Sequence, residues 1–205
     1  MKLAIVLSLL SLFIYAEKIK VWKEKAGVVI AEAEHVQNRN SLPPYWEIVR
    51  FLKGFEDDGF VQWKGTSYLK ESYEDITEGR ILTYHISVQK EGDYYLKIKG
   101  ICFDETQANV LVRINSGDWK NFVIENDGNV NWDSNQASDS YPVFFPMGYH
   151  KVEIAGVNSG FLFDKFMLVN GSLFDLQGKE NFAIPYEEKR ESKNEYISDE
   201  TFPVR

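Results

Sequence analysis

Short apolar runs, many of them alternating with polar residues, dominate the chain between Val28 and Asn170 and are separated by Gly, Asn and Asp. Such runs predict β-strands, because successive side chains of a strand point to opposite faces. We predict strands at 28–34, 59–63, 80–88, 92–99, 109–114, 141–145, 148–155 and 161–169. No long amphipathic helix is evident, and only Tyr45 to Lys53 has a pattern that fits a helical turn or a short helix. The even spacing of the strands predicts an all-β sandwich or jelly roll.

Two pairs of successive strands are expected to form antiparallel hairpins. The polar run Gln89 to Gly92 is typical of a turn, and it joins the strand at 83–88 to the strand at 92–99. A second hairpin is predicted from Tyr149 to Phe166. We also expect the early strand at 28–34 to pair with this late segment, which would bring Glu32, Glu34 and Asp164 to one oxygen-rich point.

The two ends of the chain differ from its centre. Residues 1–16 have the layout of a signal peptide, with Lys2, an apolar run too short to span a bilayer, and Ala16 at the expected cleavage site. An uncleaved anchor is the alternative. Cleavage would leave a secreted or periplasmic protein with no membrane span. Residues 17–27 are expected to be a linker, 28–170 the sandwich, and 171–205 an acidic tail that is extended, loosely packed or disordered.

The charge and cysteine content narrow the range of partners. The formal net charge is −8, and no basic stripe is visible that would neutralise the phosphates of nucleic acid. Neutral sugars, or acidic sugars held through a cation, remain compatible. Cys102 is the one cysteine and forms no intramolecular disulfide, so it is expected to be a buried strand residue. The aromatic content of 15% suits both an all-β core and a sugar-stacking surface.

Several short segments, in this order along the chain, resemble carbohydrate-binding module families 6 and 35 and their relatives among the galactose-binding-like sandwiches. The segments are 31–34 (AEAE), 59–63 (GFVQW), 79–84 (GRILTY), 92–96 (GDYYL), 148–154 (GYHKVEI) and 160–166 (GFLFDKF). The resemblance covers residues 28 to 170. It implies a jelly-roll β-sandwich of the galactose-binding-like type, and a function in binding carbohydrate.

The resemblance also implies a structural calcium ion between the first and last strands. Glu32, Glu34 and Asp164 would be its carboxylate ligands, with backbone carbonyls completing the shell of hard oxygens that Ca²⁺ prefers. Glu32 and Glu34 are two residues apart and therefore share a strand face. The alternative is that the two glutamates face solvent and that Asp164 pairs with Lys165 or Arg80.

A sugar site of the kind found in these families needs an aromatic ring for the CH face of a pyranose and polar groups for its hydroxyls. The resemblance places Trp132 and Asn158 in those roles, and Tyr45 and Trp46 in the first long loop would form a second wall. Trp132 lies among Asn and Asp and is expected in a loop, where packing over the sandwich edge is the alternative. Asn158 is equally well explained as a turn former.

No catalytic motif accompanies this pattern. The histidines show no metal-ligand spacing, and no nucleophile elbow, phosphate-binding loop or paired cysteine motif is present. The leading hypothesis is a non-catalytic carbohydrate-binding module. A protein-interaction module that uses the acidic tail is the runner-up, and a small polysaccharide lyase or glycosidase is the third candidate.

Overall fold

The computed structural model of the protein describes residues 18–36, 42–50, 59–67, 76–102, 107–125, 131–134, 142–173 and 195–198. Almost all of the regular structure in these ranges is β-strand. The strands are β1 (Lys18–Lys23), β2 (Val28–Glu32), β3 (Trp46–Val49), β4 (Phe60–Trp63), β5 (Ile81–Val88), β6 (Gly92–Cys102), β7 (Gln107–Ile114), β8 (Lys120–Glu125), β9 (Asn131–Ser134), β10 (Val143–Phe145), β11 (Gly148–Gly156), β12 (Phe161–Asn170) and β13 (Glu195–Ser198). Two short 3₁₀ helices are η1 (Glu78–Arg80) and η2 (Gly171–Leu173).

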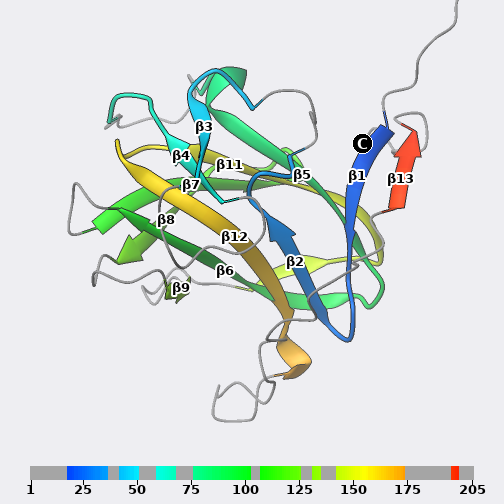
Figure 1. Cartoon of the computed structure of the whole chain (residues 1–205). Coiled ribbons are helices and arrows are strands. Elements are labelled where there is room, and N and C mark those ends of the chain that lie inside the picture. Colours follow the sequence, from blue (N-terminus) through cyan, green and yellow to red (C-terminus); the bar gives the residue numbers. More distant parts are fainter. Residues whose placement is uncertain are drawn as a thin grey trace, which may run out of the picture.

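The strands form two sheets that face each other (Figure 1). The six-stranded sheet has the order β13-β1-β5-β11-β7-β8. The seven-stranded sheet has the order β10-β6-β12-β4-β3, with β2 paired to β12 and β9 paired to β6. The β1–β5 pair is parallel, and the other strand pairs are antiparallel. The predicted all-β sandwich is confirmed.

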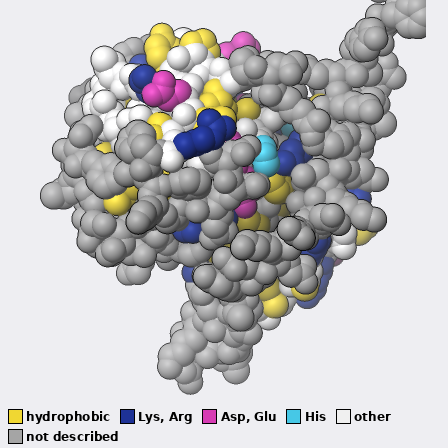
Figure 2. All heavy atoms as spheres, viewed as in Figure 1, with side chains coloured by type: hydrophobic (Ala, Val, Ile, Leu, Met, Phe, Trp, Pro, Cys, Tyr) yellow, Lys and Arg dark blue, Asp and Glu magenta, His cyan; other side chains and the backbone are white. Residues whose placement is uncertain are grey.

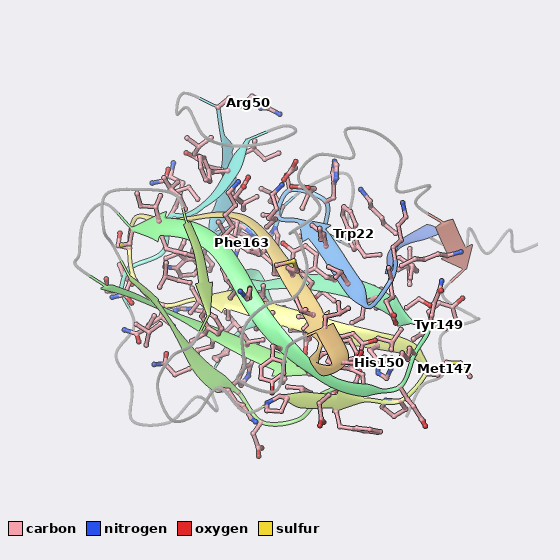
Figure 3. The ribbon with its side chains drawn as sticks, turned by 90° about the horizontal axis from the view of Figure 1, so that it is seen from below. Trp22, Arg50, Met147, Tyr149, His150 and Phe163 are labelled. Carbon is pink, nitrogen blue, oxygen red and sulfur yellow. The ribbon has the colours of Figure 1, made fainter. Side chains whose placement is uncertain are left out.

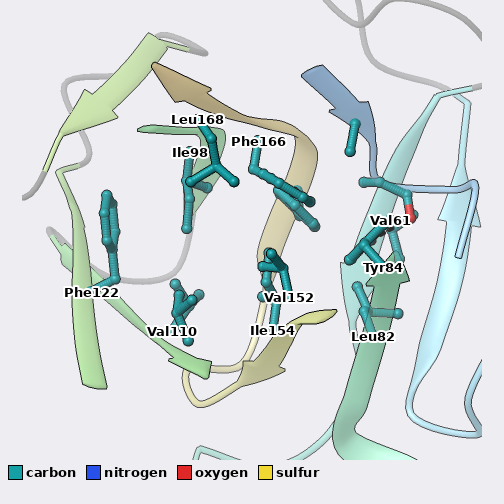
Figure 4. Packing of buried hydrophobic residues seen from close by; sticks show 14 of the residues in the cluster. Val61, Leu82, Tyr84, Ile98, Val110, Phe122, Val152, Ile154, Phe166 and Leu168 are labelled. Atoms are coloured by element: carbon teal, nitrogen blue, oxygen red, sulfur yellow. Dashed lines mark hydrogen bonds between the residues drawn. The ribbon is translucent and has the colours of Figure 1, made fainter. Parts of the chain in front are cut away.

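The core lies between the two sheets and receives side chains from both (Figure 4). Tyr84 from β5 packs edge-on against Phe163 and Phe166 from β12, with ring centroids 6.3 and 5.2 Å apart. Ile98, Phe166 and the other apolar side chains at every second strand position fill this space, which explains the alternating pattern of the sequence. Cys102 is buried in the same core and forms no disulfide, as expected.

Strand β2 pairs with β12 over its whole length, so the expected pairing of the early strand with the late segment is confirmed. Both hairpin predictions are wrong. Strands β5 and β6 are successive along the chain but lie in different sheets, and so do β11 and β12. Each of these turns therefore crosses from one sheet to the other. An alternating pattern shows that one face of a strand is buried, but not which neighbour provides its hydrogen bonds.

Glu24 holds the crossing between β5 and β6. Its carboxylate accepts hydrogen bonds from the backbone N–H groups of Gln89 (2.7 Å), Lys90 (3.0 Å) and Gly27 (3.1 Å), and from the hydroxyl of Tyr94 (2.8 Å). Glu24 is buried, and we call this arrangement the Glu24 clasp. Burial is the main cause that raises the pKa of Tyr94 to about 12, so its hydroxyl keeps the proton that it donates.

Strands β1, β3 and β13 are among those that lie where other structure was expected. Strand β1 occupies most of the predicted linker, β3 replaces the predicted helical turn after Tyr45, and β13 lies within the predicted tail. Strand β13 pairs with β1, and the two lie side by side at one edge of the six-stranded sheet (Figure 1). The six-stranded sheet therefore includes one strand from each flank of the predicted 28–170 domain. Within the residues that the structure describes, no helix is long and apolar enough to cross a membrane.

Candidate functional site

One end of the sandwich gathers several of the predicted ligand residues. At this end β5 and β12 begin, and β6 and β11 finish. We call it the loop end, and it consists of the segments 42–46, 63–67, 76–80 and 156–160. Ser159 N–H donates to Ser67 Oγ at 3.1 Å, and Lys64 N–H donates to the backbone oxygen of Tyr45 at 2.8 Å. These bonds join segments that are far apart in the sequence.

Tyr45 is the exposed aromatic residue of the loop end, with 46% of its surface accessible. Its ring packs on the buried Trp63, with centroids 5.6 Å apart, and lies close to Gly79, where a Cβ atom would come within 3.3 Å of Tyr45 Cε2. Trp63 in turn contacts the ring of Trp46 at 5.2 Å, and the Arg80 guanidinium lies 5.2 Å from the Trp63 centroid. Tyr45 is thus a surface ring that packs on the buried Trp63, which packs in turn on Trp46. We call these two buried rings the seat of Tyr45.

Trp63 keeps its place because glycines lie beside it. A Cβ atom on Gly65 or Gly156 would overlap the indole, so both positions need a residue without a side chain. Trp63 is fully buried, at 0% exposure. The contribution of Arg80 was not predicted. Its signal is weak, because an arginine directly before a strand has many structural explanations.

Trp46 and Asn158 do not present their side chains to solvent. Trp46 is 4% exposed, and its Nε1 donates to the backbone oxygen of Arg80 at 3.0 Å. Asn158 is 3% exposed, and its Oδ1 accepts the backbone N–H of Asn109 at 2.6 Å. Trp46 therefore belongs to the seat of Tyr45 instead of forming a second exposed wall, and Asn158 orders the turn between β11 and β12.

Trp132 lies in strand β9 and not in a loop, contrary to the expectation from its polar neighbours. The register of β9 on β6 places Trp132 opposite Lys99, and Lys99 lies opposite Lys165, which lies opposite Glu32. These four residues occupy one row across β9, β6, β12 and β2 in the seven-stranded sheet. We call it the charged row. The exposure of the Trp132 indole falls outside the described part of the structure.

Two lysines of the charged row form ion pairs with the carboxylates that were predicted as metal ligands. Lys165 Nζ lies 3.1 Å from Glu32 Oε1, and Lys99 Nζ lies 3.1 Å from Asp164 Oδ2. The Asp164 side chain is fully buried, at 0% exposure. A register shift between Phe163 and Lys165 marks a β-bulge at Asp164. The extra residue of a bulge changes the direction of the strand. The adjacent residues Asp164 and Lys165 can therefore both form ion pairs in this region.

The backbone oxygens beside these carboxylates also have hydrogen-bond donors. The Tyr84 hydroxyl donates to Ala33 O at 2.7 Å, and Ala33 N–H donates to Asp164 O at 2.8 Å. Burial raises the pKa of Tyr84 well above its usual value, and Glu34 and Glu32 raise it further, so the hydroxyl stays protonated. No group of three or more His, Cys, Asp or Glu side chains in the described ranges has an arrangement that holds a metal ion. The calcium site that the resemblance implies stays a prediction.

A second charged group lies on the outer face of the six-stranded sheet. Glu153 on β11 contacts Arg113 Nε at 2.7 Å and Lys151 Nζ at 3.1 Å. Burial alone would raise the pKa of Glu153. The hydrogen bonds from Arg113 and Lys151 outweigh this effect and hold that pKa below its usual value. Arg113 also stacks on Trp119, with its guanidinium carbon 4.4 Å from the ring centroid. These contacts make the group a structural network.

His85 lies beside this network, opposite Lys151 in register, and is 6% exposed. Burial and then the charge of Lys151 lower the pKa of His85 from 6.5 to about 4, while Glu153 raises it slightly. The folded state binds a proton at His85 less readily than the unfolded chain does, so protonation of His85 favours unfolding. The contribution of His85 to stability is therefore fully present above pH 6.5 and is lost as the pH falls from 6.5 towards 4. The loss should reach about 3 kcal/mol at most.

Urea unfolding above pH 6.5 and near pH 4 measures this effect. The carboxylates titrate over part of the same range, so the comparison is with His85→Gln, which lacks the ionisable ring. The wild-type protein should lose more unfolding free energy between the two conditions than the variant does. Equal losses would show that His85 does not carry this pH dependence.

The comparisons with known proteins agree with this fold. No family model matches the chain, and no curated protein matches it. A mannanase from Podospora anserina, described as a GH26-CBM35 β-(1,4)-mannanase, superposes with a TM-score of 0.54 at 16% sequence identity. The superposed region makes up 72% of this chain and 28% of the mannanase. An uncharacterised protein from Listeria monocytogenes, solved with glucose, magnesium and calcium, has a TM-score of 0.50 at 19% identity and covers 68% of this chain and 12% of its own.

A family 35 carbohydrate-binding module from Cellvibrio japonicus has a TM-score of 0.45 at 17% identity, covering 62% of this chain and 84% of its own. The chain thus spans a small part of the two larger proteins. At these identities the likeness establishes the fold and not the activity. The chain is an all-β sandwich similar in fold to part of a mannanase that carries a family 35 carbohydrate-binding module, and to part of an uncharacterised protein solved with glucose.

Proposed function

We propose that the protein is a secreted, non-catalytic carbohydrate-binding module that binds a glycan at the loop end. The observation that carries this proposal is the exposed ring of Tyr45 on its buried seat. The apolar CH face of a pyranose stacks on such a ring. The fold shared with carbohydrate-active proteins supports the same function. Export rests on the signal-peptide layout of residues 1–16.

The seat of Tyr45 favours binding because it limits the conformational entropy that a ligand must remove. Trp63 and Gly79 contact the Tyr45 ring, and the backbone of Tyr45 is held by Lys64 N–H. A ring that is fixed before binding loses little freedom when a sugar stacks on it. Over β3 and β4, apolar, basic and acidic side chains lie next to one another on the surface (Figure 2). A mixed surface of this kind suits a ligand with both CH faces and hydroxyls.

Polar partners for sugar hydroxyls lie close to the Tyr45 segment. Lys64 and Glu47 form an exposed ion pair at 2.7 Å, so one donor group and one acceptor group reach solvent beside β3. A carboxylate that is half exposed and paired with lysine differs from the buried carboxylic acid that acts as a general acid in glycoside hydrolysis. This environment of Glu47 supports a binding function over a hydrolytic one.

Tyr45→Ala should weaken glycan binding at least about tenfold. An aromatic ring that the ligand covers on binding typically contributes more than about 1.4 kcal/mol, which corresponds to this factor. The first probes are β-(1,4)-mannan and glucose-containing glycans, the sugars named for the similar structures. Affinity electrophoresis measures the dissociation constant for each. Phe144→Ala is the matched control, because Phe144 is another exposed aromatic residue, with 59% of its surface accessible, and does not belong to the loop end.

Retention that is unchanged in Tyr45→Ala, or reduced equally in Phe144→Ala, would contradict the proposed site. Trp132→Ala belongs in the same series, because the resemblance assigns a stacking role to Trp132. A release of reducing ends from any probe would show that the protein is a hydrolase or lyase instead of a binding module.

A protein-interaction module is the second candidate, and exposed apolar side chains favour it. Phe144 is 59% and Met147 is 72% exposed, at the end of the sandwich opposite the loop end. Figure 3 shows Met147 close to Tyr149 and His150, and His150 is held by Asn115 Nδ2 at 2.9 Å and Pro146 O at 2.7 Å. If this surface binds a protein, Phe144→Ala will remove the interaction while Tyr45→Ala leaves it intact.

A further inference from the structure

The buried carboxylate of Asp164 requires a positive charge nearby. Its side chain is 0% exposed, and an unpaired carboxylate in such a place would cost several kcal/mol. The Lys99 ammonium, itself 13% exposed, lies 3.1 Å away. Glu32 and Lys165, with side chains 16% and 4% exposed, form the adjacent pair. The protein therefore supplies its own cations at the place where the resemblance expects a metal.

Two ammonium groups bring to this region the same positive charge as one divalent ion would. Glu32, Glu34 and Asp164 carry three negative charges, and Lys99 and Lys165 carry two positive charges, the same as one Ca²⁺ ion. A calcium ion would have to displace both ammonium groups to reach the same oxygens.

A third lysine adds to the positive charge on the same strand. Lys97 lies two residues before Lys99 on β6, and both point away from the core residue Ile98 between them. Lys97 is 9% exposed, and burial lowers its pKa. A buried ammonium on this face makes the arrival of a further cation less favourable, since like charges repel.

We propose that Lys99 and Lys165 take the place of a divalent cation between β2, β6 and β12, so that the sandwich is stable without calcium. The proposal does not depend on the sugar-binding function. It concerns the ion pairs that join β2, β6 and β12 near the Asp164 bulge.

Thermal unfolding of the full chain in excess EDTA and in excess calcium chloride tests the proposal. The melting temperature of the wild-type protein should be the same in both. A calcium site filled at about one hundred times its dissociation constant would instead raise it by about 5–10 °C for a chain of this length. Such a rise, if it saturates with calcium, would overturn the proposal without any variant.

The double variant K99Q/K165Q removes both ammonium groups and keeps side chains of similar length. In EDTA its melting temperature should fall by about 10 °C or more, because breaking buried ion pairs leaves carboxylates without counter-charges. Calcium should restore part of this loss, since three carboxylates then remain for it. Lys120→Gln, at an exposed position on β8, is the matched control and should change little.

A fall no larger than that of Lys120→Gln would overturn the proposal, and so would a folded double variant that calcium does not stabilise. If the double variant does not fold, Lys99→Arg and Lys165→Arg provide the second comparison. These keep the charge, so each should be more stable than the corresponding glutamine variant. Equal stability of the arginine and glutamine variants would show that the charge is not what matters.

Discussion

Replacement of Glu24 by alanine should lower the free energy of unfolding by about 4 kcal/mol. The Glu24 carboxylate accepts hydrogen bonds from three backbone N–H groups and from the Tyr94 hydroxyl. Glu24 is only 4% exposed, so water cannot easily replace it as the acceptor. A buried donor left without an acceptor costs about 1–3 kcal/mol. The melting temperature should fall by about 10 °C.

Urea unfolding of Glu24→Ala, compared with Glu91→Ala, measures this effect. Glu91 lies in the same turn between β5 and β6 but is exposed, so its removal should change stability by less than about 0.5 kcal/mol. Glu24→Gln should be intermediate, because its amide retains an oxygen but places an N–H group towards some of the donors. If Glu24→Ala is as stable as Glu91→Ala, the clasp does not hold the crossing between the sheets.

Gly156→Ala is the second substitution for which a large effect is expected. A methyl group at this position would lie 2.6 Å from Trp63 Cγ, so the indole or the end of β11 must move. Overpacking of a filled core costs about 1–3 kcal/mol. Because Tyr45 packs on Trp63, the same movement should displace the exposed ring and weaken glycan binding about tenfold. Stability and binding should therefore decrease together.

The matched control is Gly117→Ala, in the turn between β7 and β8. A methyl group there would meet only the Ile114 backbone oxygen, at 3.2 Å. Chemical unfolding and the glycan titration used for Tyr45→Ala give the two measurements. If Gly156→Ala loses stability but binds the glycan as the wild-type protein does, the ligand does not depend on the Tyr45 and Trp63 pair.

The strands with the strongest alternation could be predicted from the sequence, because their pattern reflects burial of one face. Strand β5 places Leu82, Tyr84 and Ile86 in the core and His85 outside it, as period-two reasoning requires. The pairing of β2 with β12 was also predicted, as that of two segments that can be neighbours in a β-sandwich. Which sheet each strand joins could not, because the turns after β5 and β11 are compatible with a hairpin or a crossing.

Strand β1 was missed, although its first four residues alternate polar and apolar side chains as a half-buried strand does. Its sequence alternates lysine with Ile19, Val21 and then Trp22, which read as a charged linker. In the structure Lys20 is 5% exposed, and its ammonium lies 4.2 Å from the Trp22 ring centroid. A cation over an indole face is stabilised in a way that a hydrophobic pattern does not reveal.

The candidate site was predicted only in part, because some of its contacts join residues that are distant in the sequence. Tyr45 could be found, because a loop aromatic after Pro43 and Pro44 is rarely core. The burial of Trp46 could not be predicted, since it depends on Trp63 and Arg80, which are distant in the sequence. The ion pairs of Glu32 with Lys165 and of Asp164 with Lys99 were also outside the reach of local pattern, because the pairing of β2, β6 and β12 brings these residues together.

The pairing of β13 with β1 has a consequence for experiments on the C-terminal region. Lys18 lies opposite Ser198, so β13 covers the backbone hydrogen-bonding groups along the outer side of β1. Deletion of residues 171–205 would leave β1 as an open sheet edge, and open edges promote self-association into extended assemblies. Loss of partner binding in a truncated chain can thus result from aggregation as well as from removal of a contact surface. Charge-neutralising substitutions that preserve Glu195–Ser198 separate these two causes.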